Sequence, residues 1–118
     1  MPKYLVLIYG DEQQWAAAPE EWHQSNAGRH QAFIAAAGAS ILGANELEPA
    51  ARAVSIRADS RRRPSATDGP FMDTKEVIGG YYLLDAADLD EAIRLAGQIP
   101  EATASHGGVE VRPIAGSA

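Results

Sequence analysis

The chain has 118 residues, a length that supports one domain with its own hydrophobic core and is too short for two. Its hydrophobic fraction of 46% and charged fraction of 22% are those of an ordinary globular protein, and the absence of cysteine excludes disulfides, thiolate catalysis and zinc sites built on cysteine. The formal net charge of −6 disfavours binding to nucleic acid or anionic membranes. We therefore expect one cytoplasmic domain over residues 1–118, without a signal peptide, a membrane span or a nucleic-acid partner.

The first predicted elements are a strand and a long helix. The run YLVLIY (4–9) is apolar at both alternating positions, which is typical of a strand covered on both faces. A helix is expected from Pro19 to about Ala37, because proline suits the first helical position and the following Gly38 is a stop signal.

The middle of the chain predicts weaker strands. Residues 40–49 and 53–58 have the character of partial or edge strands. The segment RRRPSATDGPF (61–71) predicts a polar connector that ends in a turn, with its arginines at a solvated hairpin tip.

The last third of the chain predicts a strand, a helix and a final strand. VIGGYYLLD (77–85) is the second segment that is apolar on both faces. Asp88 is placed to cap a helix over 89–99, Pro100 ends that helix, and VEVRPI (109–114) predicts the last strand.

This order predicts an α+β domain of the ferredoxin-like βαββαβ type, with an antiparallel sheet and an extra hairpin between the second and third principal strands. The two segments that are apolar on both faces fall on the strands that this topology makes central. Two helices can cover only one face of such a sheet, so the other face needs a partner. A homodimer that packs sheet against sheet is the simplest solution.

The segment TDGPFMDTKEVIGGYYLLD (67–85), followed after a helix by VEVRPI, resembles the DGPF signature of the YCII-related family. The resemblance covers most of the chain and implies a ferredoxin-like domain that pairs into a dimeric α+β barrel. Members of this family are mostly uncharacterised. Some relatives are thought to use a His-Asp pair, a few act on small aromatic or ring compounds as lyase-like enzymes, and DGPF members often accompany extracytoplasmic-function sigma factors.

The first predicted helix carries polar residues within its apolar stripe. At 100° per residue the stripe is defined by Trp22, Phe33, Ile34 and Ala37. Asn26 lies near its middle, His30 lies well inside it, and His23 lies toward one edge. Two interpretations stay open: a pocket between helix and sheet in which water or a ligand satisfies these groups, or hydrogen bonds to protein atoms.

His30 is the best candidate for an acid-base role, because an unperturbed imidazole titrates near neutral pH. It needs an orienting carboxylate, and Asp68 or Asp73 could serve if the turn folds back toward the helix. His23 and His30 are seven residues apart, about 10 Å along a helix, so they cannot bind one metal together. No metal site is expected, because the sequence has no H-x-H or H-E-x-x-H motif. No cofactor is expected, because phosphate-binding loops and dinucleotide fingerprints are absent.

The motif itself has a structural and a functional interpretation. Its Asp-Gly-Pro run is turn chemistry. Gly79 and Gly80 predict that a helix, a partner strand or a ligand approaches the backbone closely. Tyr81 and Tyr82 are candidates to line a pocket, and Lys75 is either a surface ion-pair residue or a substrate anchor.

Two functions are therefore open. One is a small dimeric protein that binds a small organic molecule and transforms it by acid-base chemistry between the first helix and the sheet. The other is a non-catalytic sensor or regulatory module associated with sigma-factor signalling.

Overall fold

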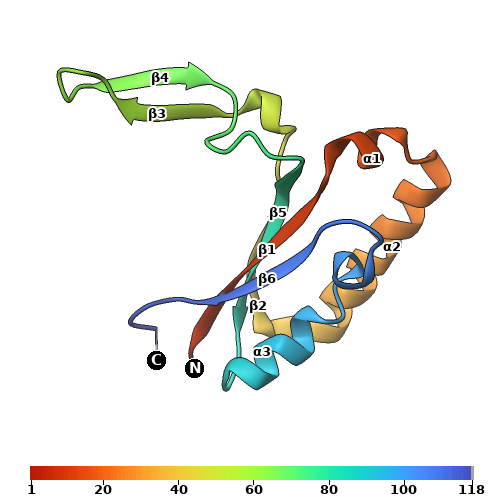
Figure 1. The fold of residues 1–118 in the computed structure, drawn as a ribbon. Helices are drawn as coiled ribbons and strands as arrows, with labels where there is room; N and C mark the ends of the chain where they lie inside the picture. The colour runs from red at the N-terminus through yellow and green to blue at the C-terminus, as the bar shows by residue number, and fades with distance from the viewer. Residues whose placement is uncertain (118) are drawn as a thin grey trace.

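The computed structural model describes residues 1–117 and shows a mixed α+β fold with antiparallel sheets, which confirms the predicted class (Figure 1). The strands are β1 (Lys3–Asp11), β2 (Ile41–Glu46), β3 (Val54–Ala58), β4 (Pro64–Asp68), β5 (Glu76–Asp85) and β6 (Gly108–Pro113). The α-helices are α1 (Glu12–Ala17), α2 (Glu20–Ala37) and α3 (Leu89–Ala96), and short 3-10 turns are η1 (Gly38–Ser40), η2 (Ala50–Arg52) and η3 (Pro100–Thr103). Within residues 1–117 no helix is long and apolar enough to cross a membrane.

Four strands form one antiparallel sheet in the order β2-β5-β1-β6. The central strands β1 and β5 are the two whose sequences are apolar on both faces. Their register pairs Val6 with Tyr82 and Leu7 with Tyr81. Because successive side chains of a strand point to opposite faces, the first pair faces the helices and the second pair faces away from them.

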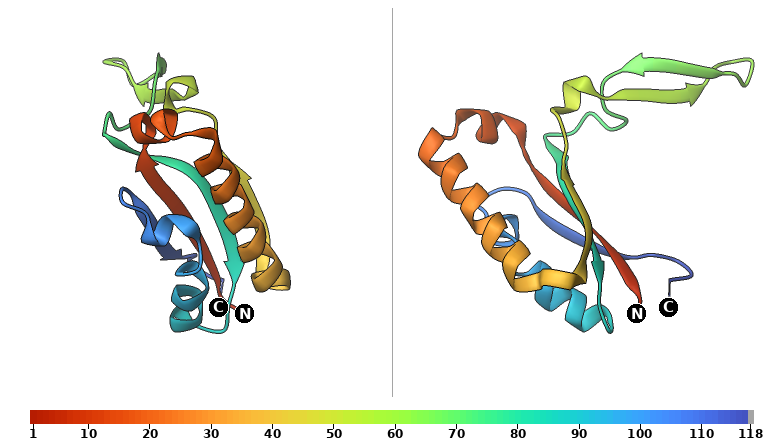
Figure 2. Two further views of the ribbon diagram at one scale, coloured as in Figure 1. Left: turned by 90° about the vertical axis from the view of Figure 1, so that its right-hand side faces the viewer. Right: turned by 180° about the vertical axis from the view of Figure 1, so that it is seen from behind.

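The hydrophobic core lies between one face of this sheet and the helices α2 and α3, which cover the same side (Figure 2). Its buried residues are Tyr4, Val6, Ile8, Phe33, Ala37, Tyr82, Leu84, Ala86, Ala92, Leu95, Ala96 and Ile99. Helix α3 begins as predicted, because the side chain of Asp88 accepts a hydrogen bond from the backbone N–H of Glu91.

Helix α2 ends where the sequence predicted, at Ala37, and its covered side contains Trp22, Asn26, His30 and Phe33. These residues recur at spacings of three and four, so they share one face of the helix. Ile34 is 38% exposed, so its place in the predicted stripe is wrong. Phe33, another member of the predicted stripe, does point to the sheet and is 2% exposed.

The opposite face of the sheet carries no helix among the described residues (Figure 2). It presents the half-buried side chains of Leu5, Leu7, Tyr81 and Leu83, which are paired across β1 and β5. We call this surface the open sheet face. A sheet face with this much apolar surface is typical of an interface.

Strands β3 and β4 form a separate two-stranded hairpin that stands away from the body of the molecule (Figures 1 and 2). We call residues 54–68 the arm. The prediction of a polar connector over residues 61–71 is therefore wrong for residues 64–68, which form strand β4. The arginines do lie at the hairpin tip, where the Asp59 carboxylate accepts hydrogen bonds from the backbone N–H groups of Arg61 and Arg63.

The close approach predicted at the strand glycines comes from Trp15 of α1, a helix that the sequence did not predict. A Cβ atom added to Gly79 would lie 2.7 Å from the Trp15 ring, and one added to Gly10 would lie closer still. At Gly80 the nearest neighbour is the backbone of Asn45 on β2, at 3.0 Å. The glycines therefore make room for one aromatic ring and for a neighbouring strand of the same chain.

Candidate functional site

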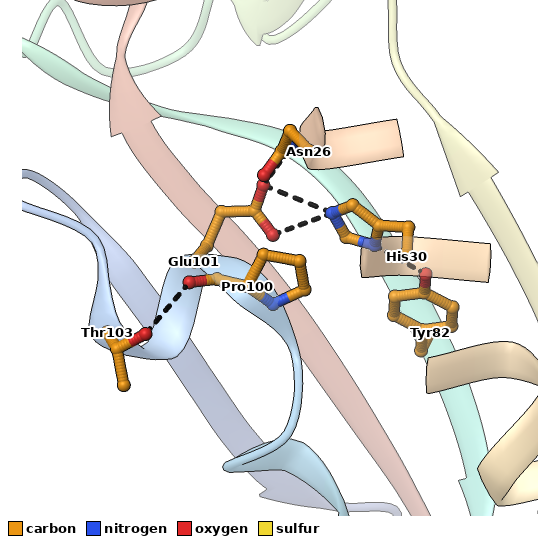
Figure 3. Close-up of polar contacts among 6 residues, drawn as sticks. All are labelled: Asn26, His30, Tyr82, Pro100, Glu101 and Thr103. Carbon is orange, nitrogen blue, oxygen red and sulfur yellow. Dashed lines mark hydrogen bonds and ion pairs between the residues drawn. The ribbon is translucent and has the colours of Figure 1, made fainter. Parts of the chain in front are cut away.

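A polar cluster lies between α2, β5 and η3, on the helix-covered side of the sheet (Figure 3). His30 Nε2 lies 2.8 Å from Glu101 Oε1 and 3.1 Å from Glu101 Oε2. His30 Nδ1 lies 2.7 Å from the Tyr82 hydroxyl. Asn26 Nδ2 donates a hydrogen bond to Glu101 Oε2 at 3.0 Å. Both ring nitrogens of His30 are therefore engaged.

Each member of the cluster is placed by a simple local rule. Asn26 and His30 are four residues apart on the covered face of α2. Tyr82 is on the helix-facing side of β5, where its ring contacts Phe33 edge to face at a centroid distance of 4.9 Å. Glu101 follows Pro100 in η3, a turn that starts directly after the buried Ile99.

The cluster holds a charged carboxylate in a buried position, since Glu101 is only 6% exposed. Burial by itself would raise the pKa of Glu101, but hydrogen bonds from His30 and Asn26, together with the charge of His30, lower that pKa below its usual value. Burial, and then the nearby charge of Glu101, raise the pKa of Tyr82 above its usual value. The cluster thus favours an ionised glutamate beside a neutral tyrosine.

The hydrogen bonds permit two protonation states of His30. In the neutral imidazole, Nε2–H donates to Glu101 while Nδ1 accepts from the Tyr82 hydroxyl. In the imidazolium, both nitrogens donate, and the hydroxyl of Tyr82 turns to accept, because a tyrosine oxygen can play either role. His30 can therefore gain or lose a proton at Nδ1 without losing either partner. Its side chain remains 20% exposed.

One carboxylate atom in the cluster has no aligned donor. Glu101 Oε1 is buried and close to His30 Nε2, but within residues 1–117 it receives no hydrogen bond of good geometry. Buried oxygens without a donor are uncommon, and many are satisfied by water or a ligand. The short contact with His30 Nε2 is its one polar neighbour among the described contacts.

The structure brings together only part of the predicted site. His30, Asn26 and Tyr82 meet as described, but the carboxylate beside His30 is Glu101 instead of Asp68 or Asp73. Asp68 pairs with Val54 in the arm, and Asp73 is exposed in the loop before β5. Neither forms a hydrogen bond or ion pair with His30 in the described chain, because the turn runs into the arm and does not fold back over α2.

The remaining predicted residues lie apart from the cluster. Tyr81 points to the open sheet face, where its hydroxyl accepts a hydrogen bond from Asn45. His23 is exposed, with Nε2 3.0 Å from the backbone oxygen of Trp15. Lys75 is also exposed and lies 3.8 Å from Asp11 Oδ2.

Lys75 lines a separate surface hollow of about 510 Å³, whose walls also include Asp11, Gln14, Thr74, Glu76, Ser105 and His106. His106 Nδ1 accepts a hydrogen bond from the backbone N–H of Asp11. Burial by itself would raise the pKa of Asp11, but hydrogen bonds from Gln13 and Gln14 lower that pKa below its usual value. These contacts tie the loop before β6 to the end of β1.

In residues 1–117, no three His, Asp or Glu side chains gather to hold a metal ion.

Glu101 is the one member of the cluster that sequence reasoning missed. Its only local signal is its position in the run Ile-Pro-Glu, where an acid directly follows two apolar residues. That pattern does not reveal which helix lies above it, so the partner of His30 could not be named in advance.

Comparison with known proteins agrees with the resemblance seen in the DGPF segment. The family model of the YCII-related domain matches residues 3–116. A protein of Rhizobium meliloti (strain 1021), named only as uncharacterised, is 38% identical over 117 residues, which span 95% of this chain and 91% of that protein. The chain belongs to the YCII-related family.

Proposed function

We propose that this protein binds a small organic molecule beside α2 and that His30, supported by Glu101, is its acid-base group. The observation that carries the proposal is the arrangement at the two ring nitrogens. A buried carboxylate fixes Nε2, and a hydroxyl that can donate or accept faces Nδ1. In this arrangement the imidazole is oriented by one partner and exchanges its proton at the other.

The exposed fifth of the His30 side chain is where a ligand would make contact. Because both nitrogens are already bonded, the ligand takes the place of the Tyr82 hydroxyl at Nδ1 or binds to that hydroxyl. A compact ring compound with a hydroxyl group suits this position, since its hydroxyl can donate to His30 Nδ1 and accept from the Tyr82 hydroxyl.

A homodimer is part of the proposal. The strand order supports a ferredoxin-like βαββαβ domain, and the resemblance of the TDGPF segment supports the DGPF subgroup. The open sheet face supports pairing with a second copy into a dimeric α+β barrel. The apolar side chains of Leu5, Leu7 and Leu83 would be covered in that dimer. The paired charges of Glu110 and Arg112 on β6 would lie at its margin.

The alternative is a non-catalytic sensor, which the same cluster supports in a different way. Every member of the cluster has a partner inside the chain, as in a structural network that binds a ligand without turnover. A regulatory module tied to an extracytoplasmic-function sigma factor is the form of this alternative that the family resemblance suggests.

The decisive experiment titrates the ¹⁵N-labelled protein with catechol, a ring compound with hydroxyl groups, and follows the histidine ring and backbone amide signals by NMR. We expect saturable shifts at the His30 ring and at the backbone amides of Asn26 and Tyr82. These shifts should be kept in His23→Gln, a control on the exposed side of the same helix, whereas the amide shifts should be lost in His30→Gln. Turnover of the probe in the wild type, lost in His30→Gln, favours the enzyme; saturable binding without turnover favours the sensor. Shifts that survive in His30→Gln would place the ligand elsewhere.

A further inference from the structure

The arm has one apolar face and one polar face. In its register Val54 pairs with Asp68, Ile56 with Ala66, and Ala58 with Pro64, so these side chains share a face that is apolar except at its root. The alternate pairs place Ser55, Arg57, Ser65 and Thr67 on the other face. Such alternation is typical of a strand pair that is buried on one side.

Nothing in the described chain buries the apolar face of the arm. Val54 is 58% exposed and Ile56 is 63% exposed, and every residue of the arm except half-buried Ser55 is exposed. A two-stranded hairpin is marginally stable alone in water and needs an apolar surface to pack against. The alternation in the arm is therefore that of a hairpin packed on another surface, yet its apolar face is exposed in the described chain.

The charge of the arm indicates what covers it. The arm holds four arginines and two aspartates, a formal charge of +2, whereas the other 103 residues hold six basic and fourteen acidic side chains, a formal charge of −8. A basic arm is thus complementary to the acidic body of another copy of the same chain. It also projects on the side of the molecule away from α2 and α3, the side of the open sheet face (Figures 1 and 2).

We propose that the arm of each chain packs against a second copy, with the Val54 and Ile56 face on the partner's body and the tip arginines over its acidic surface. This inference rests on the proposed homodimer and adds a contact that the sheet-to-sheet packing does not include. It assigns the arginine run to self-association. The arm of one copy would then be folded by contact with the other.

The first test compares two variants that add the same charge to opposite faces of the arm. Ile56→Asp changes the apolar face, and Ser65→Asp changes the polar face opposite Arg57. By sedimentation equilibrium we expect Ile56→Asp to raise the dimer Kd roughly tenfold or more, the effect of losing one central interface residue, and Ser65→Asp to leave it within about threefold. The wild-type Kd should also rise between low and high salt.

The second test detects the contact of the arm directly, by crosslinking, and does not use the Kd of a variant. Because the chain has no cysteine, Ile56→Cys and Ser65→Cys each introduce a single thiol that can carry a benzophenone photo-crosslinker. Mixed ¹⁴N- and ¹⁵N-labelled chains distinguish crosslinks between copies from crosslinks within one. We expect position 56 to give mainly crosslinks between copies and position 65 to give few.

The outcomes of these tests distinguish the arm contact from the proposed homodimer and from the proposed role of His30. A wild-type dimer whose Kd is unchanged by Ile56→Asp, with crosslinks only within one chain, overturns the arm contact and leaves the dimer standing. A wild-type monomer at 100 μM, about the upper range of weak specific association, overturns both, while the His30 proposal is untouched. Binding of a fluorescein-labelled DNA oligonucleotide that Arg61→Ala and Arg63→Ala abolish would assign the arginines to nucleic acid instead.

Discussion

Glu101 Oε1 lies 2.8 Å from His30 Nε2, although 71 residues of sequence separate the two side chains. Helix α2 supplies the histidine and the short turn η3 supplies the carboxylate, and they meet above the core face of β5. This contact converts two polar residues that would each be unfavourable inside a protein into a mutually satisfied pair. It also provides the orienting carboxylate that an acid-base histidine requires.

The pair should be energetically coupled. A double-mutant cycle with His30→Ala and Glu101→Ala is expected to give a coupling of about 1 to 3 kcal/mol in the free energy of unfolding at neutral pH, because each single change leaves a buried polar partner unsatisfied. The exposed pair Glu91–Arg94 on α3 is the matched control, for which a clearly smaller coupling is expected because solvent screens the two charges. Urea unfolding measures both, and equal couplings would show that the His30 pair is no more than a surface contact.

The lowered pKa of Glu101 predicts a specific acid sensitivity. A carboxyl whose pKa is lower in the folded state stabilises the fold at pH values above its unfolded pKa, about 4.3 for glutamate. That stabilisation is lost as the pH falls through this range toward the lower folded pKa. Glu101→Gln should therefore be less stable than the wild type near neutral pH, with a shallower loss of unfolding free energy on acidification.

Glu48→Gln, which changes an exposed loop glutamate, is the control for that measurement. Its profile of unfolding free energy against pH, obtained from urea melts, should follow the wild type. If Glu101→Gln gives the same acid slope as the wild type, the carboxylate is not held ionised by His30 and Asn26 in the way that we describe.

The raised pKa of Tyr82 predicts that its hydroxyl ionises late. Burial and the charge of Glu101 raise its pKa, so the alkaline ultraviolet titration of the wild type should contain a phase above the ordinary tyrosine range of about pH 10. Tyr82→Phe should lack that phase and should lose about 1 kcal/mol of stability, because Nδ1 of His30 loses its partner. Tyr81→Phe, on the opposite face of the same strand, should keep the phase; its loss there would assign the late titration to Tyr81.

The contact of Trp15 with the strand glycines predicts what a methyl group added at those positions would do. Gly79→Ala should destabilise the fold by about 1 to 3 kcal/mol, because the new methyl group overlaps the indole ring. Trp15→Leu in the same background should recover part of that loss. In contrast, Gly43→Ala on β2 should have little effect, since a Cβ there meets nothing within 4 Å. Thermal melts measure the stability of all three variants. Equal losses of stability in Gly79→Ala and Gly43→Ala would exclude the indole overlap as the cause.

Local patterns in the amino-acid sequence were enough to predict the class of the fold and the position of most elements. Two segments apolar on both faces identified the central strands β1 and β5, and Pro19 and Gly38 marked the ends of α2. These features are local: alternation, helical spacing and turn residues act over a few positions, so they can be read from one chain. The same spacing placed Asn26 and His30 on the covered side of α2.

The groups that those residues contact could be identified only once the packing of distant segments was known. The partner of His30 is Glu101, brought from η3 by the return of the chain after α3, and the close neighbour of Gly79 is Trp15 from the unpredicted α1. Asp68, which lies in the motif that identifies the family, is carried away in the arm. Contacts between distant segments depend on strand order and on how the elements pack, and no periodicity within one segment records them.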